Sequence, residues 1–399
     1  MFDFKHASLF LSLVQLITIV TLLIKVPKFA ENGYQLDSKD QFRLSNGDNI
    51  IVLVLDRYGN EQFEKVSKEY PEIKECLKDF TYYNNADSRY SNTFPSMTHL
   101  MTGIKRDYDN DKWLDTVWFN ERTQNFYELL HNDGYTVHLY SPYAATVYGN
   151  VENMKGMIDN ICPSKLRKNY KLIYSLLEKA TIYRYAPFAL KPRFEVRSFV
   201  YNEMVTSAEP EYKNSEFYNF LITEKLSIDD SLNNIFIVDH ILGMHDPYEI
   251  DENANKLDGD DLSASPEVLT SITRGLHVIL AEYFDQLKAL GIYDDATIIV
   301  TADHGDYFNA GGIQPILFVK QKGESHAEYQ INSSPVSHED FQGTIMTFIG
   351  EDKTPFGTSI YDWKEGDRRE RFIDNHTEGI YYTDRNELYK VIEDNHIVY

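Results

Sequence analysis

Cysteine is scarce in this sequence, and so is net positive charge. The 399 residues include two cysteines, Cys76 and Cys162, which are too few for a disulfide framework or a cysteine-rich zinc site. The formal net charge of -23 makes nucleic acid and other polyanions poor partners for the surface as a whole. The 42% of hydrophobic residues are ample for a sizeable core, so the composition favours a globular protein.

Long apolar segments are also rare, and one uncharged run, from Ala7 to Ile24, stands out. Its length is close to the minimum for a membrane-spanning helix. A cleaved signal peptide or a buried helix would explain it too, but no small-residue pattern of a cleavage site follows the run. We therefore predict a transmembrane anchor over residues 7–26 and a linker over 27–48. Lysines flank both ends of the run, so charge does not determine its topology.

Three short apolar runs have the continuous hydrophobicity of strands buried on both faces: Asn49–Leu55, Asn234–Val238 and Ala296–Val300. Segments with helical periodicity, such as Gln124–Asp133 and Ile272–Leu290, lie between them. This alternation predicts an α/β fold with a mixed, mostly parallel central sheet between helices. Ligands of such sheets bind beyond the carboxyl ends of the strands. The polar residues that follow the three runs there are Asp56, Asp239, His240, Thr301, Asp303 and His304.

We assign residues 49–350 to a catalytic domain, with a helical insertion at 150–230, and 351–399 to a small C-terminal α+β subdomain. Within the insertion, Lys165–Arg197 is rich in Lys, Arg and aromatic residues. One interpretation is a solvated basic face of the insertion. The other is a surface that meets anionic lipid headgroups or a phosphate-bearing substrate.

The segment Ser91–Gly103 places a hydroxyl group at the predicted start of a short helix. Pro95 suits the first turn of a helix and Gly103 suits its end, so Thr93 lies at the helix N-terminus. Thr93 is then either a helix cap or a nucleophile. The second role is chemically reasonable because a helix N-terminus favours anions and a nearby cation makes a hydroxyl more acidic.

Candidate metal ligands lie at the ends of two predicted strands. Asp303 and His304 follow one strand, where a turn lets both side chains point at one ion, and Asp56 follows another. This combination of oxygen and nitrogen ligands suits zinc, manganese or magnesium better than a soft metal.

These motifs resemble those of the alkaline phosphatase and sulfatase superfamily. Thr93 stands in the place of the cysteine in the sulfatase signature Cys-x-Pro-Ser-Arg, and Pro95 and Ser96 are retained. Asp303–Gly305 is similar to the Asp-His-Gly motif of the same superfamily. Met97 replaces the expected arginine, and threonine cannot be oxidised to the formylglycine of sulfatases. The resemblance therefore implies a branch with a threonine nucleophile and no formylglycine.

A second set of motifs resembles phosphoethanolamine transferases and lipoteichoic acid synthases. Their His-x-x-Gly-x-His-x-Pro pattern is matched by His240, Gly243, His245, Pro247 and Tyr248. The segment Pro335–Thr344 is similar to one that follows later in these enzymes.

The resemblance implies a role for each matched residue. One divalent metal ion would be held by Asp56, Thr93, Asp303 and His304. The catalytic residues would be Thr93, His240 and His245. The substrate would be bound by His245, His338 and Arg57. Asp239 and His338 would be the candidates for a second metal, although a one-metal site agrees better with the spacing.

The resemblance also implies a function. We expect an extracytoplasmic, membrane-anchored phosphotransferase or phosphodiester hydrolase that forms a covalent phosphothreonine. Its substrates would be cell-envelope glycans or lipid headgroups, with transfer of phosphoglycerol or phosphoethanolamine. The alternatives are a sulfatase or a phosphodiesterase for soluble esters, and an inactive membrane-tethered binding module.

Overall fold

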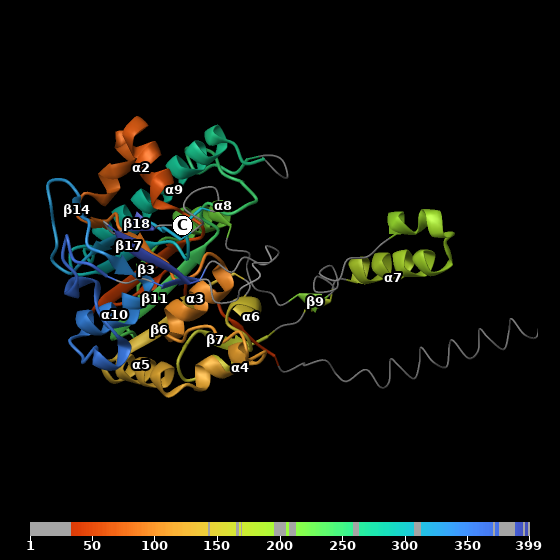
Figure 1. Cartoon of the computed structure of the whole chain (residues 1–399), viewed down its shortest axis with the longest axis horizontal. Helices are drawn as coiled ribbons and strands as arrows, with labels where there is room; N and C mark the ends of the chain where they lie inside the picture. Colours follow the sequence, from red (N-terminus) through yellow and green to blue (C-terminus); the bar gives the residue numbers. More distant parts are fainter. Residues whose placement is uncertain are drawn as a thin grey trace, which may run out of the picture. The chain divides into compact units, whose positions relative to one another are not determined.

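The predicted strands are neighbours in a seven-stranded sheet of the computed structural model (Figure 1). β3 (Asn49–Leu55) lies between β12 (Thr297–Thr301) and β11 (Asn234–Ile241), and the three run parallel. The order is β14-β4-β13-β12-β3-β11-β6, completed by β4 (Thr81–Tyr83), β6 (Tyr135–Tyr140), β13 (Leu317–Lys320) and β14 (Gln330–Asn332). Because β13 is antiparallel to both of its neighbours, the predicted mixed, mostly parallel α/β sheet is confirmed.

The structure describes residues 33–142, 144–164, 167–168, 170–194, 205–206, 213–257, 263–306, 313–369, 372–374, 388–393 and 396–397. The chain divides into an insertion unit, residues 1–34 and 163–208, and a catalytic unit, residues 35–162 and 209–399. Across the described ranges, no helix combines the length and the hydrophobicity that a membrane crossing requires. The anchor predicted over 7–26 lies outside these ranges.

Helices cover both faces of the sheet in the catalytic unit (Figure 1). The helices packed together on one face are α2 (Asn60–Glu69), α8 (Asn214–Glu224) and α9 (Pro266–Leu290). Those on the other face are α3 (Thr93–Thr102), α5 (Glu121–Asn132) and α10 (Phe341–Ile349). Ile235 and Ile237 of β11 join the core beneath α9, whereas Phe236 contacts Phe126 of α5 at a ring distance of 6.5 Å. Successive residues of β11 therefore belong to different layers.

β11 continues beyond the predicted end at Val238, so Asp239 and His240 are part of the strand. The continuation is stabilised by parallel pairing with β3, where His240 lies opposite Val54. Two adjacent strand residues point to opposite faces of a sheet. Only one of these two side chains can therefore face the α3 side.

The predicted linker is folded over its described part, residues 33–48. It carries β1 (Tyr34–Leu36) and β2 (Arg43–Leu44), and β2 pairs with β10 (Ser227–Ile228). Phe42 is buried against Phe217 of α8, with ring centroids 5.5 Å apart. The linker assignment is therefore wrong for these residues, because a few apolar side chains dock an otherwise polar segment.

The C-terminal region begins against the catalytic core. Residues 351–369 include two short 3-10 helices, η8 (Thr354–Phe356) and η9 (Ile360–Asp362). Arg369 forms an ion pair with buried Asp340, and its Nη2 donates to Asp340 Oδ1 at 2.9 Å. Beyond it, β16 (Phe372–Asp374), β17 (Leu388–Glu393) and β18 (His396–Ile397) form a three-stranded antiparallel sheet.

Candidate functional site

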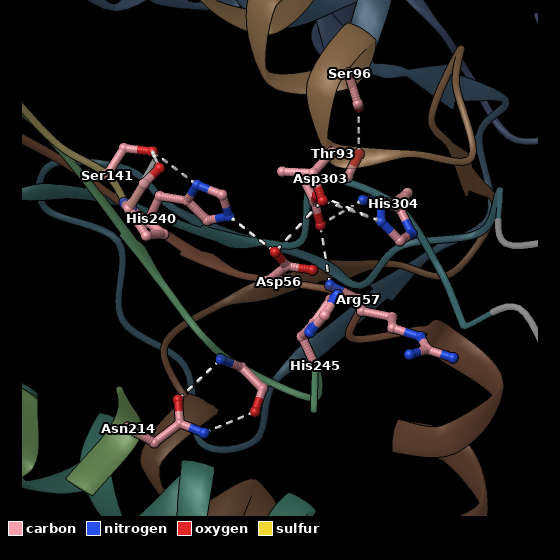
Figure 2. A network of polar contacts seen from close by, with 12 residues as sticks. Asp56, Arg57, Thr93, Ser96, Ser141, Asn214, His240, His245, Asp303 and His304 are labelled. Carbon is pink, nitrogen blue, oxygen red and sulfur yellow. Dashed lines mark hydrogen bonds and ion pairs between the residues drawn. The ribbon is translucent and has the colours of Figure 1, made fainter. Parts of the chain in front are cut away.

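Three of the predicted metal ligands meet at the carboxyl ends of β3 and β12 (Figure 2). Asp56 follows β3 directly, and Asp303 and His304 follow β12. The two strands are paired in parallel, with Thr301 opposite Val54, which brings their ends together. One ligand atom from each of the three buried side chains lies within 4.8 Å of the others. The structure thus assembles a group of the size that one metal ion would bridge.

Two buried oxygen atoms of this group have no hydrogen-bond partner among the described residues. They are Asp56 Oδ1 and Asp303 Oδ2. A buried carboxylate oxygen without a partner is unfavourable unless a cation or a donor compensates it. Two carboxylates and one imidazole form a set of ligands that suits a divalent ion of hard or borderline character. The described residues therefore fit such an ion.

Asp56 is charged at neutral pH. Burial alone would raise the pKa of its carboxyl group, but the adjacent imidazole of His240 and the nearby charges of His304 and His245 lower that pKa below its usual value. Asp56 Oδ2 lies 3.4 Å from His240 Nε2. A carboxylate that stays ionised adds to the attraction of this group for a cation.

Thr93 faces the same group from the first turn of α3. Its Oγ1 lies 3.4 Å from Asp56 Oδ2 and 3.5 Å from His304 Nε2. The N-cap position belongs to Asn92, and α3 ends at Gly103 with a left-handed φ of 68°. The hydroxyl of Thr93 therefore points at the candidate ligands, one residue inside the helix, where the partial positive charge of the helix end favours an anion.

Backbone groups fix the orientation of the ligands. Asp303 Oδ1 accepts from the N–H groups of Arg57 and His304, both at 2.9 Å. His304 Nδ1 lies 2.7 Å from the carbonyl oxygen of Gly305, so a proton on Nδ1 leaves the lone pair of Nε2 facing the carboxylates. The Ser96 hydroxyl donates to the carbonyl of Asp303 and ties α3 to the same turn. Contacts of this kind hold ligands in place and adjust their basicity.

His240 comes from the end of β11 and is fully buried on the α3 side of the sheet. Its Nδ1 lies 3.0 Å from Ser141 Oγ, which in turn accepts from Tyr148 OH at 3.2 Å. The other nitrogen, Nε2, faces Asp56 (Figure 2). This chain of contacts fixes the imidazole in the site, as expected for a catalytic residue.

A cavity of about 300 Å³ opens beside these residues. Asp56, Thr93 and His240 line one side of it, and His245 and Lys213 line it as well. His245 is 39% exposed, and its Nδ1 lies 2.6 Å from the carbonyl oxygen of Asp246. The cavity is the place where a substrate would meet the Thr93 hydroxyl.

Lys213 is a cavity residue that the sequence did not reveal. It occupies the N-cap position of α8, far from the motifs along the chain. The next residue, Asn214, forms two hydrogen bonds of 2.8 Å with the backbone N–H and carbonyl groups of Gly243, as Figure 2 shows. Ser215 N also donates to Glu249 Oε1 at 3.1 Å. The only signal that the sequence gives for Lys213 is a lysine at the start of a short apolar helix. Such lysines are common on protein surfaces.

The glycine of the predicted histidine motif has a clear structural reason. Gly243 has a φ of 59°, in the left-handed region. A Cβ atom there would lie 2.4 Å from the backbone nitrogen of Asp56. Any side chain would push the loop that carries His245 away from the end of β3.

Two other predicted residues, Arg57 and His338, are not among the described residues that line the cavity. The Arg57 guanidinium pairs with Asp246 at 3.6 Å and with Asp306 at 3.5 Å. His338 is buried with its Nε2 3.3 Å from Thr301 Oγ1, and burial lowers its pKa to about 4. Neither side chain lines the cavity, so their substrate-binding roles stay predictions without support from the geometry.

Asp239 lies on the opposite face of the sheet from His240. Its Oδ1 accepts from Gln41 Nε2 at 2.8 Å, and burial raises its pKa to about 7. The metal-ligand group of the described residues contains neither Asp239 nor His338. The alternation of side chains along β11 explains why Asp239, a candidate for a second metal, is directed into the core.

The comparisons with solved structures concern the fold of the chain. A search of curated protein sequences finds no match. Among solved structures, Ps i-CgsB in complex with a neocarrahexaose is 15% identical, with a TM-score of 0.54 over 83% of this chain and 80% of that one. An alkaline phosphatase superfamily protein of Vibrio parahaemolyticus is 14% identical, with a TM-score of 0.50 over 92% and 81%. The lipoteichoic acid synthase LtaP of Listeria monocytogenes is 14% identical, with a TM-score of 0.46 over 86% and 82%.

The family itself is identified by sequence. The profile of the Sulfatase family matches residues 48–351, which include β3, α3, β11 and β12 and thus every candidate ligand. Enzymes of this family and of the alkaline phosphatase superfamily are hydrolases or transferases that act on phosphate or sulfate esters. This chain is an enzyme of that class and belongs to the Sulfatase family.

Proposed function

We propose that this chain is a phosphotransferase or phosphodiester hydrolase with Thr93 as its nucleophile. The observation that carries the proposal is the position of Thr93 Oγ1, 3.4 Å from Asp56 and 3.5 Å from His304, at the wall of a cavity. A threonine cannot supply the aldehyde of a sulfatase. Met97, at the position of the sulfatase arginine, is fully buried and offers no charge to a substrate. Both features favour phosphate over sulfate esters.

The residues present indicate how the reaction proceeds. Asp56, Thr93, Asp303 and His304 would hold a divalent cation, which makes a hydroxyl more acidic and offsets charge on phosphate oxygens. Thr93 Oγ1 releases its proton to water and attacks phosphorus, the bond to the leaving oxygen breaks, and a phosphothreonine forms. His245, half-exposed in the cavity, protonates the leaving oxygen. Lys213 attracts the negatively charged ester. An acceptor hydroxyl or water then attacks phosphorus and releases Thr93.

The cell envelope is the setting that we propose for this activity. The support is the predicted anchor at 7–26 together with the resemblance of the His240–Tyr248 motif to envelope phosphotransferases. The donors would be phosphoglycerol- or phosphoethanolamine-bearing lipids, and the acceptors would be glycans or lipids. Protease added to intact cells should digest the catalytic unit. Protection until lysis would contradict the extracytoplasmic assignment.

The ester class can be tested on the purified chain loaded with zinc or manganese. Bis-p-nitrophenyl phosphate should be cleaved much faster than p-nitrophenyl sulfate. Faster cleavage of the sulfate ester would instead identify a sulfatase. No turnover of any ester, with metal bound, would favour an inactive binding module.

A further inference from the structure

The insertion unit exposes an unusual amount of apolar surface. It contains α7 (Tyr170–Tyr185) and the 3-10 helix η4 (Phe188–Phe194), which together we call the α7–η4 surface. Of the twelve large hydrophobic residues that are exposed in the described part of the chain, eight lie here. They are Tyr170, Tyr174, Leu177, Ile182, Tyr183, Tyr185, Phe188 and Leu190. Phe188 is 89% exposed, and such an apolar surface on a soluble protein indicates an interaction site.

Little within the described residues supports α7. Leu176 is the one buried residue along the helix. Isolated helices of this length are marginal in water, and most helical stability in proteins comes from packing of an apolar face. A partner that covers the exposed side chains would therefore stabilise α7.

Three of the four exposed tyrosines of α7 lie on one side of the helix, and the fourth, Tyr183, lies on the opposite side. Tyr170, Tyr174, Leu177 and Tyr185 are separated by four, three and eight residues, which places them on one face of the helix. Tyrosine is typical of the interface between lipid and water, where its ring is buried and its hydroxyl stays hydrated. This face suits the headgroup region of a membrane better than the core of a protein.

The charge of the surface identifies the kind of membrane. Residues 170–194 contain one acidic residue, Glu178, and five basic ones: Lys171, Lys179, Arg184, Lys191 and Arg193. The chain as a whole carries -23. Lys191 Nζ lies 5.1 Å from the ring centre of Tyr183, so η4 packs beside α7 and adds Lys191 and Arg193 to the basic residues of the α7–η4 surface. A local excess of basic residues in an acidic protein is complementary to anionic lipid.

The connection of the chain provides an independent argument. Ser164 N donates to the carbonyl of Gly33 at 2.7 Å, so the segment that precedes α7 is bound to a residue shortly after the predicted anchor. Gly33 is seven residue steps from position 26, and a fully extended chain of seven steps spans at most about 25 Å. If residues 7–26 span a bilayer, the start of the insertion lies within that distance of its surface.

We propose that the α7–η4 surface lies in the headgroup region of an anionic bilayer, as a second membrane contact beside the predicted anchor. Aromatic and aliphatic side chains enter the interface, and the basic side chains bind lipid phosphates. Two contacts restrict the motion of the protein over the membrane more than a single flexible tether does. The local concentration of lipid substrate at the enzyme rises accordingly.

The test uses the full-length chain reconstituted into vesicles of equimolar phosphatidylcholine and phosphatidylglycerol, with bromine on the lipid chains near the headgroups. Phe188→Trp reports on the proposed surface. Phe119→Trp is the matched control, because Phe119 is also exposed, at 61%, but belongs to the catalytic unit. The added tryptophan signal, taken as the difference from the wild-type chain, should be quenched by bromine at position 188 and not at 119.

Charge reversal separates this contact from the anchor. Lys179→Glu together with Arg184→Glu should lower the quenching at position 188 to the level of the control, while the chain stays in the vesicles. High salt should have the same effect. Equal, weak quenching at positions 188 and 119 would overturn the proposal. Concentration-dependent cross-linking through residue 188 without lipid would overturn it too, because a second copy of the chain would then be the partner.

Discussion

The two walls of the cavity differ in how they are built. We use the term metal wall for Asp56 and Thr93, which line the cavity, together with Asp303 and His304, which lie next to them. These residues come from the ends of central strands and the start of α3, and the three candidate ligands Asp56, Asp303 and His304 are buried. The substrate wall, with Lys213 and His245, comes from the N-terminus of α8 and the loop after β11. The comparison indicates that the sheet holds the candidate metal ligands and the nucleophile in place, while more exposed segments determine which substrate binds.

The largest effect should follow a change in the metal wall. Asp303→Asn keeps the shape of the side chain but removes its charge and one candidate ligand atom. We expect kcat to fall by about 100-fold or more, in the range seen when one electrostatic contact to a transition state is lost. Bound zinc or manganese, measured by elemental analysis, should fall in parallel. Unchanged metal content would remove Asp303 from the metal wall.

A change in the substrate wall should have a smaller and different effect. Lys213→Met keeps the apolar stem and removes the charge of a residue that lines the cavity. We expect kcat/KM for an anionic phosphodiester to fall about 10-fold, mainly through KM, because binding of the ester is weakened. Lys225→Met, at the other end of α8, is the control and should leave both constants unchanged. An equal effect of the two variants would show that Lys213 has no specific role.

Rigidity of the substrate wall can be tested at Asn214. Asn214→Ala leaves the N–H and carbonyl groups of Gly243 without their partner, which should lower the free energy of unfolding by about 1 to 3 kcal/mol. Activity should fall only a few-fold, because the metal wall is untouched. Urea denaturation and steady-state kinetics measure the two effects. A loss of bound metal in this variant would mean that the two walls are not independent.

A change at Asp239, on the face of the sheet opposite His240, should have the smallest effect on activity. Burial raises the pKa of Asp239 to about 7 in the folded chain, above the ordinary value of 3.8. Between these two values the folded state holds a proton on Asp239 that the unfolded state releases. The contribution of the protonated Asp239 to the free energy of unfolding is therefore lost as the pH rises from about 4 to 7. Asp239→Asn should remove that loss and leave kcat unchanged. Urea midpoints as a function of pH would reveal it, and a strong loss of activity would place Asp239 in the site.

The sequence predicted that Asp56, Asp303 and His304 lie close together, because they follow continuous apolar strands. Strand ends can be recognised from hydrophobicity alone, and parallel pairing brings them together. The sequence could not assign Asp239 and His240 to opposite faces, because the extra length of β11 depends on pairing with β3. Lys213 was missed for a similar reason. Its place at the cavity depends on the contacts of Asn214 with a loop that is distant in sequence.

The central claim is that Thr93 forms a covalent bond to phosphorus. The most direct test is a mass spectrum of the metal-loaded enzyme, quenched in acid during turnover of bis-p-nitrophenyl phosphate. Attack by Thr93 releases one p-nitrophenolate and leaves a p-nitrophenylphosphoryl group on the peptide that contains Thr93. We predict that group on wild-type enzyme and its absence, with loss of turnover, in Thr93→Ala. Continued turnover by Thr93→Ala, or the group on another residue, would contradict the account.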